Sequence, residues 1–218
     1  GLLAATNSGN TVVAAASMAA SDAKSLVFTA NDTVTALTVT GDTVLSDAVT
    51  IAALDTGTNI GTLTIAKITG SATDLAAAES AVLNLGTSVV ATDAVTIAQI
   101  TGFAGTVDVY SITDSYNNLM VDSDVTGAVD AAAVITAAVT ITVNSGALTA
   151  DQAVDLRAVD GAAAATNFVY SIVDNDKNIL DAIGGSAAEK AALTNATSVK
   201  GMDGVALTIQ SVGGDVSL

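Results

Sequence analysis

Residues 93–100 read DAVTIAQI, and residues 47–54 read DAVTIAAL. A weaker copy, QAVDLRAV, begins at Gln152. Catalytic residues rarely recur along a chain, whereas structural segments of repeat proteins do. The repeated octapeptide therefore favours a repeat architecture over an enzyme. The valines that its alignment makes equivalent are Val49, Val95, Val154 and, for a fourth copy, Val205.

Two further blocks recur in the same order along the chain. AESAVLNLGTSVVATDAV at Ala78 returns as AEKAALTNATSVKGMDGV at Ala188, and VYSITDSYNNLM at Val109 returns as VYSIVDNDKNIL at Val169. Blocks in fixed order at intervals of about 50 residues are typical of repeat proteins, in which loops lengthen while stacked segments keep their order. We therefore expect a single elongated repeat domain with about four units. Their approximate bounds are 1–60, 61–108, 109–168 and 169–218.

The local patterns predict short strands and short helices. Stretches rich in Val, Ile and Thr predict strands that begin near Ser25, Ala36, Thr62, Thr87, Val107, Val139, Phe168 and Thr197. Ala-rich runs with Ser or Thr and an early acid predict N-capped helices near Thr73, Thr149 and Ser186. One strand and one short helix every 20–30 residues or so is typical of solenoids. We expect a β-rich repeat solenoid, a β/α solenoid with a parallel sheet and short helices; the alternative is a pure parallel β-helix.

The composition disfavours several classes of function. The chain carries 22 acidic and 6 basic residues, a net charge of −16, and nucleic-acid binding requires clustered basic residues. It has no His, Cys or Trp, so the usual general base near neutral pH and the usual aromatic pocket walls are missing. Tyr110 and Tyr170 occupy equivalent repeat positions, which predicts core residues. We therefore expect no enzyme and no nucleic-acid partner.

The apolar content does not predict membrane insertion either. The most apolar run, residues 131–143, is well short of the roughly 18 residues that a membrane-spanning helix needs. The first residues, GLLAATNSGN, contain no Met and no basic region of a signal peptide. We expect the chain to be a segment of a longer protein.

One stretch, DNDKNILD from Asp174, has the alternating oxygen ligands with which a calcium loop begins. The calcium candidates are Asp174, Asp176, Asn178 and Asp181. A full calcium loop needs Gly at its sixth position and Glu at its twelfth, where this chain has Ile179 and Gly185. The competing interpretation is that these Asp and Asn side chains bond to their own backbone as the chain leaves a strand. Ca²⁺ is the one cofactor that the sequence suggests.

A Ser-Ile-x-Asp-x-x-x-Asn block occupies residues 111–118 and 171–178, accompanied by Ala-rich and Gln-Ala blocks. The matching residues are Ser111, Ile112, Asp114, Asn118 and Leu119, then Ser171, Ile172, Asp174, Asn178 and Ile179. Over most of residues 60–200 this combination resembles the Ala/Thr/Val-rich repeats of very large secreted proteins of marine bacteria, cyanobacteria included. The glycine-rich calcium nonapeptide of many such exported proteins is absent.

The resemblance implies a structural repeat module of an extracellular bacterial surface, filament or S-layer-like protein. Such a module acts by stacking and self-assembly, so its partners are copies of itself or neighbouring repeats of a longer chain. The alternative is an adhesin or phage-fibre module that binds a glycan or a surface. The regions that would then carry binding loops are 116–125 and 161–166.

Overall fold

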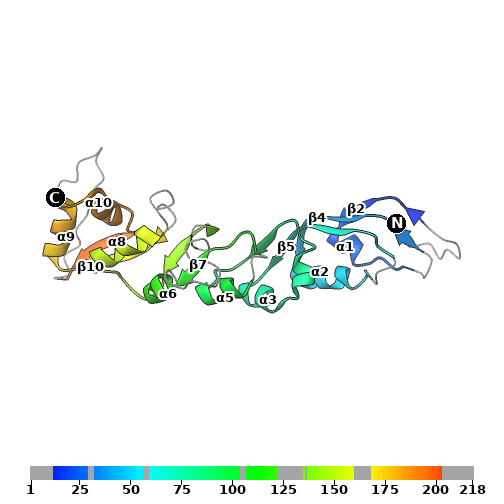
Figure 1. Ribbon diagram of the computed structural model, residues 1–218, viewed down its shortest axis with the longest axis horizontal. Coiled ribbons are helices and arrows are strands. Elements are labelled where there is room, and N and C mark those ends of the chain that lie inside the picture. The colour runs from blue at the N-terminus through cyan, green and yellow to red at the C-terminus, as the bar shows by residue number, and fades with distance from the viewer. Residues whose placement is uncertain are drawn as a thin grey trace. The chain divides into compact units, whose positions relative to one another are not determined.

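Short parallel strands alternate with short helices in the computed structural model (Figure 1). The structure describes residues 12–28, 32–55, 59–103, 107–121, 135, 137–159 and 168–202. The chain divides into two compact units. The N-terminal unit comprises Gly1–Asp93 and Gly102–Val109, and the C-terminal unit comprises Ala94–Thr101 and Tyr110–Leu218. Of the predicted fold, the parallel sheets and the short helices that alternate with the strands are confirmed, and the chain is of the mixed α/β class.

The N-terminal unit is built on a four-stranded parallel sheet. In sheet order, which is also chain order, its strands are β2 (Ala16–Ala19), β4 (Leu37–Val44), β5 (Leu63–Gly70) and β6 (Val89–Ala91). A smaller parallel pair consists of β1 (Val12–Val13) and β3 (Thr33–Val34). The register places Leu37 beside Leu63 and Ile68 beside Val89, all of them buried. Like side chains of consecutive strands therefore form continuous apolar columns.

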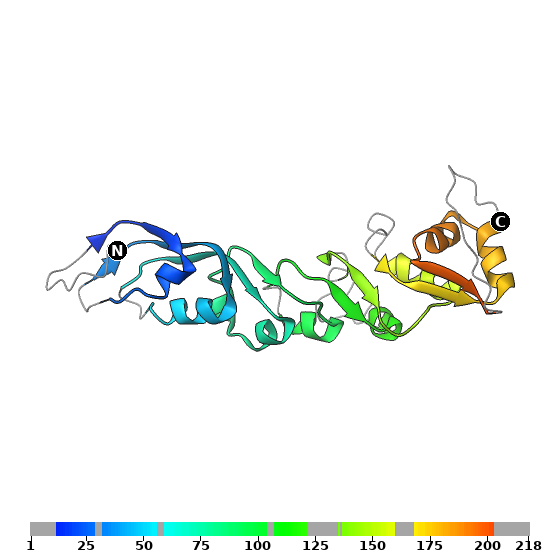
Figure 2. The same ribbon diagram turned by 180° about the vertical axis from the view of Figure 1, so that it is seen from behind.

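Helices connect these strands and cover one side of the sheet. They are α1 (Ala20–Ala23), α2 (Leu45–Ala52), α3 (Ala72–Ala77) and α4 (Ser80–Leu83). Helix α1 contacts β4 and α2 contacts β5, and both helices lie on the same side of the sheet (Figures 1 and 2). Parallel strands need such a crossover connection, because the chain must return to the end of the sheet at which the previous strand began before the next strand can start.

The C-terminal unit repeats this pattern with shorter strands. Its strands are β7 (Ile112–Asp114), β8 (Ile141–Val143) and β9 (Phe168–Val169) in one parallel sheet, and β10 (Ser171–Asp174) and β11 (Ser198–Gly201) in another. Its helices are α5 (Ile97–Gly102, whose last residue belongs to the N-terminal unit), α6 (Tyr116–Val121), α8 (Ala150–Val159), α9 (Asp176–Gly184) and α10 (Ala187–Thr194). Helix α8 packs against β10 and α10.

The core of the C-terminal unit is a column of side chains from consecutive strands. Ile112, Ile141 and Phe168 lie side by side in register and are all buried. Thr113 and Thr142, the next residues on β7 and β8, point to the partly exposed face. Alternation along a strand produces this division into an apolar and a polar face.

Three expectations from the sequence need correction. Residues 25–28 form no strand, because the Ser25 and Leu26 amides donate to Asp22 and Ala23 carbonyls at the end of α1. The pure parallel β-helix is wrong, since the Ala-rich run that it treats as a corner is the ten-residue helix α8. The third correction concerns the octapeptide.

The two near-identical octapeptides have different structures. Residues 47–54 lie mostly in helix α2, where the Thr50 hydroxyl donates to the Ser46 carbonyl. In residues 93–100, Thr96 instead begins helix α5: its Oγ1 accepts from the Gln99 amide, and Gln99 Oε1 accepts from the Thr96 amide at 2.9 Å. This capping box needs the Gln, and the first copy has Ala53 at that position.

The predicted equivalence of the valines is therefore wrong. Val49 is 48% exposed on α2, Val95 is fully buried in a β-bridge to Ile112, and Val154 lies on α8. Val205 lies outside the described residues. The structural counterpart of Val95 is Leu148, which is also buried in a β-bridge and also precedes a Thr-x-x-Gln cap.

Thr43 provides a first prediction about the core. Its side chain is fully buried on β4 beside Ile68, and within the described part of the chain its hydroxyl has no hydrogen-bond partner. Thr43→Val removes this buried hydroxyl and keeps the shape, so we expect the free energy of unfolding to rise by about 1 kcal/mol in urea titrations. The control Thr38→Val lies on the exposed face of the same strand and should change it by less than about 0.5 kcal/mol. A destabilised T43V variant would contradict this packing.

Gly61 provides a second prediction, about how closely neighbouring chain segments approach. Its amide donates to the Val34 carbonyl at 2.9 Å, and a Cβ at Gly61 would lie 2.7 Å from the backbone oxygen of Thr35. We expect Gly61→Ala to lower the free energy of unfolding by about 1–3 kcal/mol, because backbone must move. Gly184→Ala is the matched control, since a Cβ there meets nothing within 4 Å. Equal thermal midpoints for the two variants would contradict this close approach.

Candidate functional site

The recurring Ser-Ile-x-Asp-x-x-x-Asn block forms the junction between a strand and a helix. At the end of β7, Asp114 is 5% exposed, and its Oδ1 accepts from the Ser115 amide and from Asn118 Nδ2, both at 2.7 Å. Ile112 and Leu119 on either side of the junction are fully buried. The block is thus a local cap that turns the chain from sheet into helix.

The second copy has the same geometry at the end of β10. Asp174 is 4% exposed, and its Oδ1 accepts from the Asn175 amide at 2.8 Å and from Asn178 Nδ2 at 3.0 Å. Asn175 is the N-cap of α9, and its side chain accepts from the Asn178 amide. The interpretation that Asp side chains bond to the local backbone here is therefore confirmed for Asp174, and Asn175 does the same.

The second oxygen of each aspartate reaches the preceding helix. Asp114 Oδ2 accepts from the Ile97 amide at the start of α5, and Asp174 Oδ2 accepts from the Ala150 amide at the start of α8, both at 2.9 Å. In the N-terminal unit, Asp93 Oδ1 accepts from the Ala72 amide at the start of α3. A carboxylate at a helix N-terminus satisfies a free N–H and interacts favourably with the helix dipole.

These three hydrogen bonds, Asp93–Ala72, Asp114–Ile97 and Asp174–Ala150, are called the carboxylate links. Each joins the helix of one strand–helix segment to the carboxylate at or after the next strand. The same helices also have caps of their own, in which Ser71, Thr96 and Thr149 accept from the amide three residues on. Sequence reasoning singled out Asp114 and Asp174 within the block but missed the links. Two of these helices, α5 and α8, begin with a Thr-x-x-Gln cap, and this pattern is the local signal in the sequence that marks where they start.

Of the four calcium candidates, the structure joins Asp174 and Asn178 by a hydrogen bond. Both oxygens of Asp174 accept from protein donors, Asn178 turns its Nδ2 toward Asp174, and Asp181 pairs with Lys177. Asp176 Oδ1 is buried against Gly201. Over the described ranges, the acidic residues form no group of three that could hold a metal ion. Calcium binding at these residues stays a prediction.

Two of the tyrosines belong to the core. Tyr110 and Tyr170 are buried, as their equivalent positions predict. The Tyr170 hydroxyl donates to the Ala192 carbonyl at 2.7 Å and so joins the residue between β9 and β10 to α10. Burial raises the pKa of Tyr170, and the nearby Arg157 partly opposes this shift. Both rings therefore contribute to the core of the fold.

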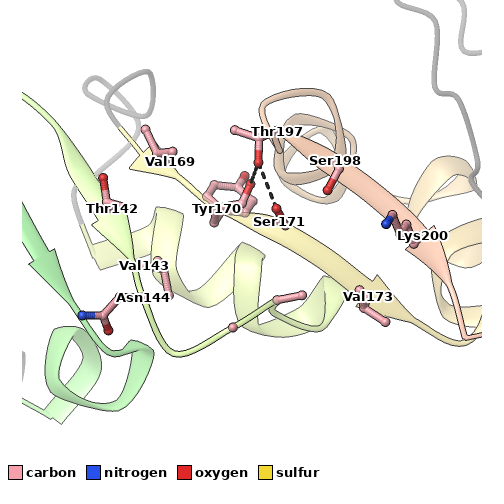
Figure 3. A pocket seen from close by; sticks show the side chains of 12 residues that line it. Thr142, Val143, Asn144, Val169, Tyr170, Ser171, Val173, Thr197, Ser198 and Lys200 are labelled. Carbon is pink, nitrogen blue, oxygen red and sulfur yellow. Dashed lines mark hydrogen bonds between the residues drawn. The ribbon is translucent and has the colours of Figure 1, made fainter.

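An open groove of about 460 Å³ lies in the C-terminal unit on the outer face of β8 to β11 (Figure 3). Val169, Ser171 and Val173 alternate along β9 and β10 and line it. Thr142 lies opposite Val169, Ser198 opposite Ser171, and Lys200 opposite Val173. Sequence reasoning missed this groove, because its residues come together only through the register of the strands.

Some expected binding regions cannot be assigned. Residues 122–125 and 161–166 lie outside the described residues, and residues 116–121 form α6. None of the helices in the described ranges has the length and apolar character that crossing a bilayer requires.

The class defined by this geometry is a mixed α/β protein with parallel strands joined in chain order and carboxylate links between segments. Comparison of the chain with protein-family models, curated proteins and solved structures finds no match.

Proposed function

We propose that this chain is a structural repeat module of an extracellular bacterial surface, filament or S-layer-like protein, built as a β/α solenoid. The observation that supports this most is the order of the strands. In the two larger sheets, β2-β4-β5-β6 and β7-β8-β9, the parallel strands lie side by side in chain order, and the carboxylate links repeat between segments. A solenoid is built from segments that contact mainly their neighbours, and it can be extended by adding further segments.

In this proposal the role is mechanical and non-catalytic. Each strand–helix segment contributes a few buried aliphatic side chains, such as Ile65, Ile112 and Ile172, to a core shared with its neighbours. Burial contributes about 25 cal/mol per Å² of apolar area, so many small contributions add along the stack. The links add hydrogen bonds with charged acceptors, which contribute about 1.5–3 kcal/mol each.

The extracellular location rests on other grounds. The repeated block resembles secreted bacterial surface proteins, and the acidic excess keeps such a protein soluble and favours cations as partners. Four units of about 50 residues, each with two strand–helix segments, remain our proposal for the division of the chain.

Self-assembly of the purified chain is the direct test of this function. We expect sedimentation velocity to show species that grow with protein concentration, and negative-stain electron microscopy to show filaments or lattices. Measurements with and without Ca²⁺ separate assembly through the protein alone from assembly bridged by ions. A monomer at every concentration, with and without Ca²⁺, would contradict self-assembly.

A further inference from the structure

The groove on the outer face of β8 to β11 has an unusual charge for this chain. Among the described residues that line it, Lys200 alone is charged, in a chain with a net charge of −16. In the described residues, Lys24, Lys67 and Lys177 each pair with an aspartate, whereas Lys190 on α10 and Lys200 in the groove are exposed and form no ion pair there. An ammonium group in a groove whose described lining residues include no carboxylate favours an anionic ligand.

The hydroxyl groups of the groove are held in place by a chain of hydrogen bonds (Figure 3). Thr197 Oγ1 donates to the Tyr170 carbonyl at 2.7 Å, so Ser171 Oγ, 3.0 Å from Thr197 Oγ1, is the donor to it. The lone pairs of Ser171 Oγ therefore remain able to accept from a ligand hydroxyl. Ser198 lies directly opposite and adds a second hydroxyl.

The groove also has an apolar part, which matches the faces of a sugar ring. Val169 and Val173 flank Ser171 along the strands, and Val169 is 37% exposed. A sugar ring presents C–H groups on its faces and hydroxyls at its rim, which match valine side chains beside serine and threonine hydroxyls. The groove volume falls within the range of about 300–1,000 Å³ that is typical of ligand sites, and the groove is open to solvent, as a chain-like ligand requires.

We propose that this groove binds a segment of an acidic polysaccharide, with a sugar carboxylate on Lys200, ring hydroxyls on Ser171 and Ser198, and C–H faces on Val169 and Val173. This site goes beyond the structural role, because it would attach the module to an extracellular polysaccharide. It lies within one compact unit and does not require self-assembly, so either proposal can fail without the other.

The test is a titration of the ¹⁵N-labelled full chain with tetragalacturonate, followed by amide chemical shifts. The matched neutral ligand is the methyl-esterified tetramer, which keeps the sugar and removes the charge. We expect shifts concentrated at 169–173 and 197–200, and weaker binding at higher salt. Lys200→Gln should weaken binding about three- to fivefold, as for an exposed ion pair, and Lys190→Gln, on α10, should not change it.

Three results would overturn the proposal. They are shifts scattered over the chain, equal binding of the charged and esterified tetramers, and equal effects of K200Q and K190Q. Shifts scattered over the chain are also the result expected if the acidic sugar bound only as a nonspecific counterion. An absence of shifts up to millimolar ligand would overturn it as well.

Discussion

Replacing Asp174 by alanine is expected to lower the free energy of unfolding by about 3–5 kcal/mol. Its two oxygens accept from the Asn175 and Ala150 amides and from Asn178 Nδ2. Because Asp174 is only 4% exposed, water cannot readily replace it at these donors. Leaving a buried donor unpaired costs about 1–3 kcal/mol. The link between α8 and β10 is lost together with the local cap.

Urea unfolding of matched variants measures this effect. Asp155→Ala removes an exposed carboxylate from the same helix α8 and should change stability by less than about 0.5 kcal/mol. Asp174→Asn, which keeps the size but offers one acceptor oxygen, should fall between the two. If D174A were no less stable than D155A, the carboxylate links would have no role in holding the segments together.

The second large effect is expected at Ile141, at the centre of the apolar column of the C-terminal unit. It is fully buried between Ile112 and Phe168 of the neighbouring strands. Ile141→Ala should lower the free energy of unfolding by about 2–5 kcal/mol, because it removes transfer free energy and leaves a cavity in contact with both neighbours. Urea titration of the full chain provides the measurement.

Thr142→Ala is the control for Ile141, since the adjacent side chain points to the other face of β8 and is partly exposed. A loss of less than about 1 kcal/mol is expected there. In a double-mutant cycle of Ile112→Ala and Ile141→Ala, the loss of stability of the double variant should differ from the sum of the two single losses, because the two side chains share one column. Similar losses for I141A and T142A would contradict the register.

Local signals predicted much of the secondary structure. Strands β4, β5, β8 and β11 lie where Val, Ile and Thr alternate, and helices α3, α8 and α10 lie where Ser or Thr precedes an Ala-rich run. These features depend on side-chain alternation and caps within a few residues, which a single sequence displays. Helix α9 was missed because DNDKNILD, which contains its first turns, was interpreted as ligand or turn chemistry.

The octapeptide shows why repetition of letters was not enough. Six of its eight letters are common to 47–54 and 93–100, yet the Gln at position 99 moves the helix start to Thr96. The same Thr-x-x-Gln cap aligns Thr96 with Thr149, and this alignment differs from the one based on the valines. Structural equivalence here follows capping rather than composition.

The site was less predictable than the fold. The carboxylate links join residues 21, 17 and 24 positions apart, so no fixed spacing reveals them. The groove likewise combines Thr142, Ser171 and Lys200 through pairings of strands that are separated by loops of different length. Both features depend on which segments lie side by side.

The most direct test of the central claim is a long-range HNCO experiment, which detects scalar couplings across hydrogen bonds in solution. If consecutive segments stack and are linked as described, the Ala150 amide couples to the side-chain carboxyl carbon of Asp174, and the Ile112 amide couples to the carbonyl carbon of Thr140. Coupling of these two amides to other carbonyl groups instead would show that the segments are arranged differently, and the proposed solenoid would be wrong.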